Sequence, residues 1–279
     1  MNGSLPTIYR NRKNMMMKSR NDSFAIRHGA LFDASALAYD RFRPGYPDTA
    51  IDDIVSLSNL RPDSRLLEIG CGTGQATVPL ARRGYRIDCV DPGKNLLALA
   101  RKKCRQWPGV SFTPARFEDV ELRSLAYHLV FSAQAFHWTR PGLRLRKVAR
   151  LLGGRGSLAL LYNYPAAPKD DLLEMLSSLI QRESGGLLSA WNYEDEVKGW
   201  IEEIGGSGLF KDLRMSRHSW HQRYSAEEYA SLFRTYSDFL SLPTALQNRV
   251  SRCIRRFISR YGGSVCRPYD CVLIHARKS

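Results

Sequence analysis

The sequence predicts an α/β fold, a doubly wound sheet in which most strands run parallel. Short apolar segments alternate with stretches of about 10 to 15 residues that have helical periodicity, the pattern of successive β-α-β units. A glycine-rich turn joins the first of those apolar segments to a helix. A length of 279 residues, with 43% hydrophobic and 25% charged residues, suits one large domain and excludes wholesale disorder.

The first half of the chain supplies the alternating units. A helix is expected at residues 48–58, where Asp48 occupies an N-cap position ahead of apolar residues with helical spacing. Five strands follow, at residues 65–69, 86–90, 110–114, 129–132 and 157–163. The helices expected among them cover residues 75–83, 93–107 and 141–151. Strands connected in this way lie parallel, with right-handed crossovers.

The second half departs from this alternation. Ser225 and Glu228 have the spacing of a capping box, which marks the start of a helix. A last strand at residues 269–276 is expected to join the sheet edge as an antiparallel partner. The other expected elements are helices at 170–183, 226–240 and 243–261, a glycine-interrupted stretch at 185–208 and a strand at 209–220.

The composition also divides the chain into an N-terminal extension and a folded domain. Residues 1–28 are polar and basic and have no periodicity, so we expect them to form a disordered extension. We expect residues 29–279 to form a single domain. Within it, the helical segments 165–208 and 224–262 interrupt the sheet pattern, so they are expected to act as a cap or lid over the ligand pocket.

The charge balance is strongly basic. The chain has 42 Lys and Arg against 27 Asp and Glu, a formal net charge of +15. Such a surface attracts polyanions and steers anionic ligands, but the same charges also occur on ordinary solvated helix faces. Because no aromatic-interleaved basic motif accompanies the charge, nucleic acid is not the expected partner.

Other sequence features bear on compartment and metals. No apolar run approaches the ~18–20 residues of a membrane span, so we expect no membrane partner. The basic N-terminus lacks the apolar core of a secretory signal. The six cysteines are scattered, and no His/Cys cluster has metal-ligand spacing. These observations predict reduced thiols, no metal site and a cytoplasmic location.

The strongest local signal is the turn after the first strand, where Gly70, Gly72 and Gly74 alternate with other residues. Glycines let the backbone approach a ligand, and the following helix N-terminus offers unpaired N–H groups. A pyrophosphate-binding turn has a different glycine spacing, and no Lys-Ser/Thr pair of a phosphate loop follows. Glu68 precedes the glycines and suits a cationic ligand, while Asp91 closes the second strand and suits ribose hydroxyls.

This pattern resembles the class I S-adenosylmethionine-dependent methyltransferases, whose motif is an acid, alternating glycines and a second acid at the next strand end. The resemblance covers about residues 32–163, and more loosely the rest. It implies a Rossmann-like sheet of seven strands, one of them antiparallel, with helices on both faces. The chain is most similar to the small-molecule branch that includes trans-aconitate methyltransferases. The motifs that carry this closer likeness are Tyr39-x-x-x-Arg43-Pro44-x-Tyr46-Pro47, Ala133-Gln134-Ala135-Phe136-His137-Trp138 and Tyr224-Ser225-x-Glu227-Glu228-Tyr229.

The resemblance implies S-adenosylmethionine as cofactor and assigns residues to it. The glycine loop and Glu68 should frame the methionine part, Asp91 should hold the ribose, and the adenine should lie near residues 116–118. At that last position many members have an acid and then a small residue, whereas this chain has Arg116 and Phe117. The predicted cofactor-binding residues are Glu68, Gly70, Cys71, Gly72, Gly74, Asp91, Phe117, Glu118 and Ser132.

The acceptor is expected beyond the carboxyl ends of the strands. Four residues are predicted to bind it, namely Tyr39, Arg43, Trp138 and Asn163. Arg43 has two interpretations. It binds a carboxylate, which belongs either to the cofactor or to the acceptor, or it caps a surface turn. His137 either acts as a general base or lines the pocket wall. Three aromatic residues, Trp191, Tyr193 and Tyr236, either face the pocket or pack in the core.

The sequence therefore predicts an enzyme that transfers the methyl group of S-adenosylmethionine to a small-molecule acceptor, with a carboxylate as one candidate. Two alternatives stay open. A nucleic-acid methyltransferase would use the basic surface, although the Asn/Asp-Pro-Pro-Tyr tetrad of many such enzymes is missing. A non-catalytic protein that binds S-adenosylmethionine would keep the glycine loop without turnover.

Overall fold

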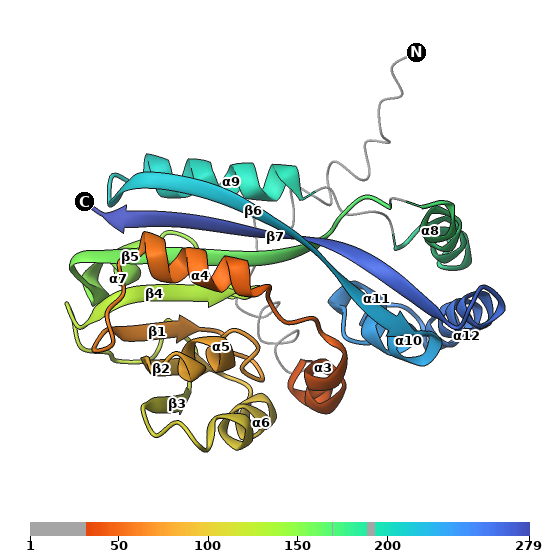
Figure 1. Cartoon of the computed structure of the whole chain (residues 1–279), viewed down its shortest axis with the longest axis horizontal. Helices are drawn as coiled ribbons and strands as arrows, with labels where there is room; N and C mark the ends of the chain where they lie inside the picture. Colours follow the sequence, from red (N-terminus) through yellow and green to blue (C-terminus); the bar gives the residue numbers. More distant parts are fainter. Residues whose placement is uncertain (1–31, 169, 189–192) are drawn as a thin grey trace, which may run out of the picture.

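A computed structural model describes residues 32–168, 170–188 and 193–279, so the extension expected at residues 1–28 lies outside the described residues. A seven-stranded sheet runs through the molecule in the order β3-β2-β1-β4-β5-β7-β6, with helices on both of its faces (Figure 1). The predicted α/β fold class is confirmed. Within the described residues, no helix combines the length and the apolar character needed to cross a membrane.

The strands follow the predicted segments closely in the first half and are longer in the second. They are β1 (Arg65–Ile69), β2 (Arg86–Asp91), β3 (Val110–Pro114), β4 (Tyr127–Ala133), β5 (Leu152–Pro165), β6 (Phe210–Ser225) and β7 (Ser264–Lys278). The helices are α3 (Ala36–Phe42), α4 (Asp48–Leu57), α5 (Thr77–Arg82), α6 (Lys94–Cys104), α7 (Arg144–Leu151), α8 (Asp171–Glu183), α9 (Glu194–Gly206), α10 (Ala226–Phe233), α11 (Ser237–Leu240) and α12 (Thr244–Arg260). A short 3-10 helix covers Phe136–Trp138.

The place of β7 corrects one expectation. β7 pairs antiparallel with β5 on one side and with β6 on the other, so the prediction that it lies at the sheet edge is wrong. The side chains of β7 are buried without interruption from Tyr269 to Ala276, as an interior strand requires. In β6 most side chains are exposed or only partly buried, as expected for a strand at the edge of the sheet. β7 remains the one antiparallel strand of the sheet.

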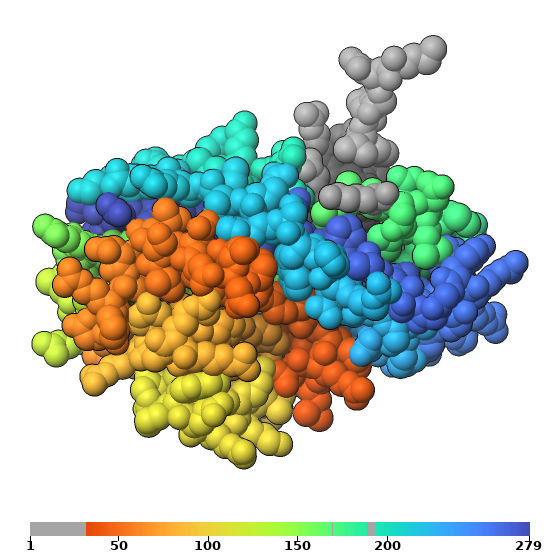
Figure 2. Space-filling model, viewed as in Figure 1, coloured from red at the N-terminus to blue at the C-terminus, as the bar shows by residue number. Residues whose placement is uncertain are grey.

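Helices cover each face of the sheet through separate apolar clusters. On one face lie α4, α5 and α6 (Figures 1 and 2). They contribute buried side chains such as Ile54, Leu80 and Leu97. On the other face, Val148 of α7 and Trp200 of α9 pack against the same strands. The sequence missed α9, because glycines interrupt this stretch, although its buried side chains have helical spacing.

A third cluster joins α8, α10, α11 and α12 beyond the carboxyl ends of the parallel strands (Figure 1). The capping box at Ser225 and Glu228 forms as predicted, and the carboxylate of Asp170 accepts a hydrogen bond from the Leu173 N–H at 2.8 Å. The expected helix at 226–240 is divided into α10 and α11. We refer to α8, α10, α11 and α12 as the cap; α9 lies within the segment expected to be cap but packs against the sheet.

Candidate cofactor and acceptor site

The glycine loop between β1 and α5 has a backbone that other residues adopt only under strain. Gly70, Gly72 and Gly74 have φ values of +70°, +54° and +86°, in the left-handed region that favours glycine. At Gly70 there is also no space, because an added Cβ would overlap the Cβ of Ala135 in the turn after β4. The loop is thus pressed against the end of β4, and its backbone borders the hollow described below.

Asp91, the last residue of β2, holds this loop in place. Its Oδ2 accepts a hydrogen bond from the Gly72 N–H at 2.9 Å, and its Oδ1 accepts one from the Gly93 N–H at 2.8 Å. Burial raises the pKa of the Asp91 carboxyl, and these two backbone bonds counteract the rise. Each carboxylate oxygen keeps a lone pair for a further donor, such as a ribose hydroxyl.

Glu68 lies one strand away and is 1% exposed. Its Oε2 accepts a hydrogen bond from the Thr77 hydroxyl at 2.5 Å. Burial raises the pKa of Glu68 to about 8, and the charge of Asp91 adds to the rise. A cationic ligand beside this carboxyl would favour its ionised form, so the electrostatics of the loop suit a positively charged group.

A hollow lies at the carboxyl ends of β1, β4 and β5, between the glycine loop and the cap. The residues around it are Tyr39, Arg43, Pro44, Tyr46, Glu68, Gly70, Cys71, Gly72, Gln75, Ala76, Ala133, Gln134, Asn163, Pro165, Tyr236 and Tyr269. The structure therefore brings the predicted residues Tyr39, Arg43, Cys71 and Asn163 to one place with Glu68, Gly70 and Gly72.

Arg43 is the cation among these lining residues. Its guanidinium lies 4.3 Å from the centre of the Tyr236 ring and 5.2 Å from that of Tyr39. Its Nη2 donates a hydrogen bond to the carbonyl oxygen of Thr235 at 2.7 Å, which ties α3 to the cap. Its buried Nε has no hydrogen-bond partner among the described residues. Arg43 thus lies over two tyrosine rings and has a donor to spare.

Two amide side chains line the opposite wall in fixed orientations. The Nε2 of Gln134 donates to the carbonyl oxygen of Asn163 at 2.7 Å, so the Oε1 of Gln134 points away from that carbonyl. The Nδ2 of Asn163 donates to the carbonyl oxygen of Gly45, and its Oδ1 accepts from the Trp220 indole. Gln134 has a φ of +59°, an uncommon backbone conformation for a side chain of this size.

Sequence reasoning did not assign several of the lining residues. Tyr46 and Gln134 lie inside the motifs that carry the closer family likeness, so their position in those motifs was a usable signal. Tyr236 and Tyr269 reach the hollow only because the cap folds over it. Behind them, Arg267 donates to the Tyr236 hydroxyl at 3.3 Å and lies 5.3 Å from the centre of the Tyr269 ring.

Comparisons with known proteins agree with this arrangement. A family model described as "Methyltransferase domain" matches residues 66–156, which run from β1 into β5 and include the whole glycine loop. A probable S-adenosylmethionine-dependent methyltransferase of Saccharomyces cerevisiae is 28% identical over 128 residues, which cover 44% of this chain and 44% of that protein. Residues 66–156 therefore match a methyltransferase domain, and the chain is similar to S-adenosylmethionine-dependent methyltransferases.

Two further relatives set the extent of the likeness. An uncharacterized methyltransferase of Mycobacterium tuberculosis is 30% identical over 174 residues, or 62% of this chain, and the match spans only 57% of that protein's length. A solved structure of a putative type II methyltransferase from Anaeromyxobacter dehalogenans matches with a TM-score of 0.60 and 21% identity. That match covers 85% of this chain and 98% of the other, and it shows the shared fold.

Five residues predicted to hold the cofactor are not among those around the hollow, namely Gly74, Asp91, Phe117, Glu118 and Ser132. Gly74 and Asp91 belong to the glycine loop and its support, and the other three lie elsewhere. The Ser132 hydroxyl donates to the carbonyl oxygen of Ile69 at 2.7 Å and links β4 to the end of β1. Phe117 is buried in the core beneath the ammonium of Lys147. The Oε1 of Glu118 accepts a hydrogen bond from the Arg140 N–H at 2.5 Å. These contacts show Ser132, Phe117 and Glu118 supporting the walls of the domain.

His137 and Trp138 also lie outside the hollow, in the short helix after β4. The His137 ring lies 4.8 Å from the Trp138 ring and stacks on Tyr162 at 6.1 Å between ring centres. Trp138 packs edge-on to Phe32. Among the other aromatic candidates, the Tyr193 hydroxyl donates to Asp270 at 2.8 Å, away from the hollow, and Trp191 lies outside the described residues.

Proposed function

We propose that the chain transfers the methyl group of S-adenosylmethionine to a small-molecule acceptor that carries a carboxylate or a comparable anionic group. The observation that supports this proposal most directly is Arg43. Its guanidinium borders the hollow beside the glycine loop, stacks on two tyrosines and forms no ion pair with an acid among the described residues. A planar cation with donors to spare suits a carboxylate.

The residues of the loop fit the cofactor. Glu68 is a buried carboxyl that accepts hydrogen bonds from the Thr77 hydroxyl and, weakly, from the Cys89 thiol. Because burial has removed water from this carboxyl, a cationic methionine group would stabilise its ionised form instead. Asp91 retains acceptor capacity for ribose hydroxyls while it fixes Gly72 and Gly93. The bound sulfonium would supply the activated methyl group, and the chain would supply alignment and the exclusion of water.

Alignment accounts for much of the catalysis in this proposal. Holding a nucleophile and a methyl donor in line contributes roughly 7–11 kcal/mol in well-oriented systems. A carboxylate acceptor is ionised at neutral pH and needs no general base, so the distance of His137 from the hollow does not count against the reaction. The trans-aconitate methyltransferases, which the motifs around Arg43 and Gln134 resemble, also belong to the small-molecule branch.

The nucleic-acid alternative fits the hollow less well. A nucleic-acid methyltransferase needs a basic path that leads a phosphate backbone to the cofactor. Among the described residues around the hollow, Arg43 is the one Lys or Arg, and the rest of the lining is formed mainly by tyrosines, prolines and amides. This lining favours a compact acceptor.

The test is a methyl-transfer screen. The protein is incubated with S-adenosylmethionine and panels of carboxylic acids, phenols and amines, and methylated products are detected by mass spectrometry. We expect carboxylic acids to gain a methyl ester and the rate to fall with added salt, because ions screen fields beyond ~8 Å at ~0.15 M. A neutral acceptor that reacts equally well at low and high salt would contradict the anionic acceptor.

Calorimetry separates failure of the acceptor assignment from failure of the cofactor assignment. Folded protein that binds neither S-adenosylmethionine nor S-adenosylhomocysteine at millimolar concentration would overturn the methyltransferase proposal as a whole. Tight binding of both, without turnover on any panel, would favour the non-catalytic alternative.

A further inference from the structure

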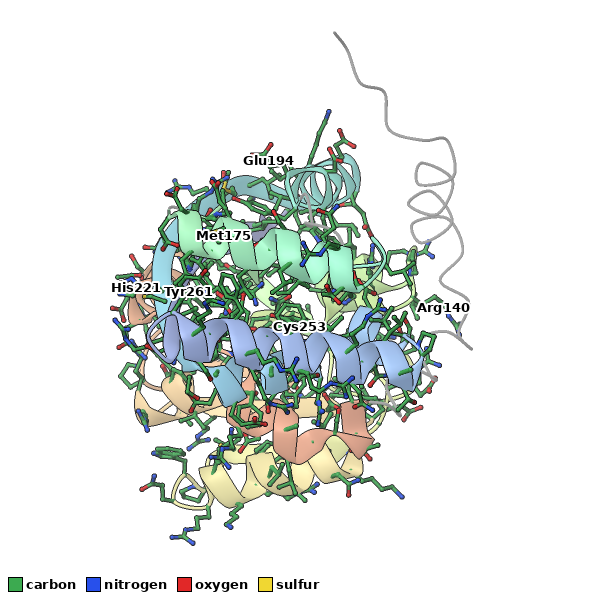
Figure 3. The ribbon with its side chains drawn as sticks, turned by 90° about the vertical axis from the view of Figure 1, so that its right-hand side faces the viewer. Arg140, Met175, Glu194, His221, Cys253 and Tyr261 are labelled. Carbon is green, nitrogen blue, oxygen red and sulfur yellow. The ribbon has the colours of Figure 1, made fainter. Side chains whose placement is uncertain are left out.

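We propose that the outer face of the cap is a binding surface for an anionic lipid bilayer. The surface consists of three arginines of α12, Arg252, Arg256 and Arg260, together with exposed apolar side chains of the cap. It lies on the face of the molecule that is turned toward the viewer in Figure 3, where α12 and α8 run side by side. This inference does not depend on the proposed acceptor.

The five arginines of α12 divide into two groups. Arg255 forms an ion pair with Glu227 of α10 at 2.5 Å, and Arg249 donates to the carbonyl oxygen of Glu183 at the end of α8. These two arginines fasten α12 to its neighbours. The other three are Arg252, Arg256 and Arg260; they are exposed and form no ion pair with an acid among the described residues.

The three unpaired arginines form a line on one side of the helix. Spacings of four residues place successive side chains on the same face, about 6 Å apart along the axis. α12 contains no acidic residue that would neutralise them. Its opposite side is buried through Val250, Ile254 and Ile258, so the arginine side necessarily points away from the cap core. The result is a continuous cationic stripe without counter-charges on its own helix.

Exposed apolar side chains accompany this stripe. Met175 of α8 is 50% exposed and Tyr261, directly after α12, is 43% exposed; Figure 3 labels both on the same face. Leu187, just beyond α8, is 49% exposed. Three of the six large exposed apolar residues found among the described residues thus lie in α8 or directly after α8 or α12. Single exposed apolar residues are common on protein surfaces, so these side chains support the proposal only through their place beside the arginine stripe.

Charge and apolarity together favour a bilayer over a nucleic acid. A phosphate backbone needs cations but offers no apolar phase for a methionine or leucine side chain. An anionic leaflet offers both, because arginines bind the headgroups while apolar side chains enter the acyl boundary. The sequence excluded a membrane-spanning segment and led us to expect no membrane partner. A surface-bound cap requires no spanning helix, so the proposal departs from that expectation.

The test compares two triple variants by co-sedimentation with vesicles. The first variant, Arg252→Gln/Arg256→Gln/Arg260→Gln, removes the stripe. The second, Arg105→Gln/Arg123→Gln/Arg155→Gln, removes three exposed arginines near the starts of β3, β4 and β5, at the opposite edge of the sheet. Both variants lower the net charge by three, from +15 to +12, so they differ only in where the charge is lost.

We expect the wild-type chain to bind vesicles of phosphatidylcholine with roughly one-third phosphatidylserine, and to bind pure phosphatidylcholine vesicles far more weakly. The stripe variant should bind the anionic vesicles about a hundredfold more weakly, since each basic side chain near an anionic leaflet contributes a factor of about five. The control variant should stay within about twofold of wild type, because its charges lie at the amino ends of the strands, at the other end of the sheet from the cap. Met175→Ser should weaken binding about fivefold.

Three outcomes would overturn the proposal. The first is no binding of the wild-type chain to anionic vesicles. The second is an equal loss in both triple variants, which would assign binding to net charge. The third is tight binding of a labelled single-stranded RNA while the vesicles stay unbound. If the stripe variant lost this RNA binding and Met175→Ser kept it, the stripe would be assigned to nucleic acid. Circular dichroism melts establish that each variant is folded.

Discussion

The hollow has two walls, one that we propose for the cofactor (the cofactor wall) and one that we propose for the acceptor (the acceptor wall), and the two are constructed differently. The cofactor wall comes from one stretch of chain between Glu68 and Ala76, and its shape depends on backbone conformation, on the buried carboxyl of Glu68 and on the contact of Asp91 with Gly72. The acceptor wall gathers side chains from α3, from the turn after β4, from β5 and from the cap. The first wall is local and backbone-based, whereas the second is assembled from distant segments and consists of side chains.

This difference has a physical consequence for specificity. A backbone loop and two acids recognise features common to every S-adenosylmethionine molecule. A wall of exchangeable side chains can be altered without disturbing that loop. Substitutions in the cofactor wall should therefore abolish binding of the cofactor, while substitutions in the acceptor wall should change which acceptor reacts and how tightly it binds.

The largest expected effect is that of Gly70→Ala. The new Cβ would overlap Ala135 and would also force alanine into a left-handed backbone conformation, so the loop must move. We expect the affinity for S-adenosylhomocysteine to fall at least a hundredfold in calorimetry, since the conformation costs ~1–2 kcal/mol before the overlap is counted. Gly45→Ala is the matched control, because nothing lies within 4 Å of its added Cβ. Unchanged binding by Gly70→Ala would show that the loop tolerates displacement.

Asp91→Asn should have the next largest effect. An amide replaces one of two acceptors and brings an NH₂ group against a backbone N–H, so either Gly72 or Gly93 loses its partner. An unsatisfied buried donor costs about 1–3 kcal/mol, which predicts a loss of about thirtyfold in cofactor affinity.

Asp88→Asn is the control for this change. Asp88 lies on the same strand but at its other end, where it accepts hydrogen bonds from Arg65, Ser111 and Tyr127. It should lower the free energy of unfolding in denaturant titration and leave cofactor affinity unchanged. Equal losses of affinity in both variants would mean that strand stability, and not the loop contact, controls binding.

The ionisation of Glu68 predicts that the affinity for the cationic cofactor changes about tenfold for each pH unit. With a pKa of about 8, the carboxyl holds a proton at lower pH and is ionised above it. The affinity for a cationic ligand should therefore rise as the pH increases toward about 8 and then level off. A free glutamate ionises near its ordinary value of 4.5, so the ligand-free fold loses stability as the pH rises between these two values.

Glu68→Gln keeps an acceptor for the Thr77 hydroxyl and cannot ionise. In this variant, both the rise in affinity and the fall in thermal midpoint across that range should disappear. If Glu68→Gln showed the same pH dependence of affinity and thermal midpoint as the wild type, the titration would belong to another group.

The smallest expected effect belongs to the acceptor wall. Arg43→Lys keeps the charge but loses the planar stack on Tyr236 and Tyr39, so the KM of an anionic acceptor should rise about fivefold with cofactor affinity unchanged. Arg41→Lys, on the same helix but exposed, should leave the KM as it is. If Arg43→Lys instead weakened cofactor binding alone, Arg43 would be reassigned to the methionine carboxylate.

The sequence by itself determined the strand–helix alternation and the cofactor loop. Both depend on interactions between near neighbours. Apolar periodicity decides whether a segment becomes a helix or a strand, and a left-handed backbone at Gly70, Gly72 and Gly74 requires glycine whatever surrounds it. The capping box at Ser225 was predictable for the same reason, because its two hydrogen bonds join residues three positions apart.

Only the tertiary structure decided the acceptor wall and the order of the last strands. Arg43 and Thr235 are 192 positions apart in the chain, and their contact forms because the cap folds over α3. Likewise, the burial of β7 on both faces depends on β6 adding beside it. His137 was a predicted site residue and Tyr236 was left open between pocket and core, yet only Tyr236 borders the hollow. Such pairings are set by the packing of whole elements, which local propensity does not encode.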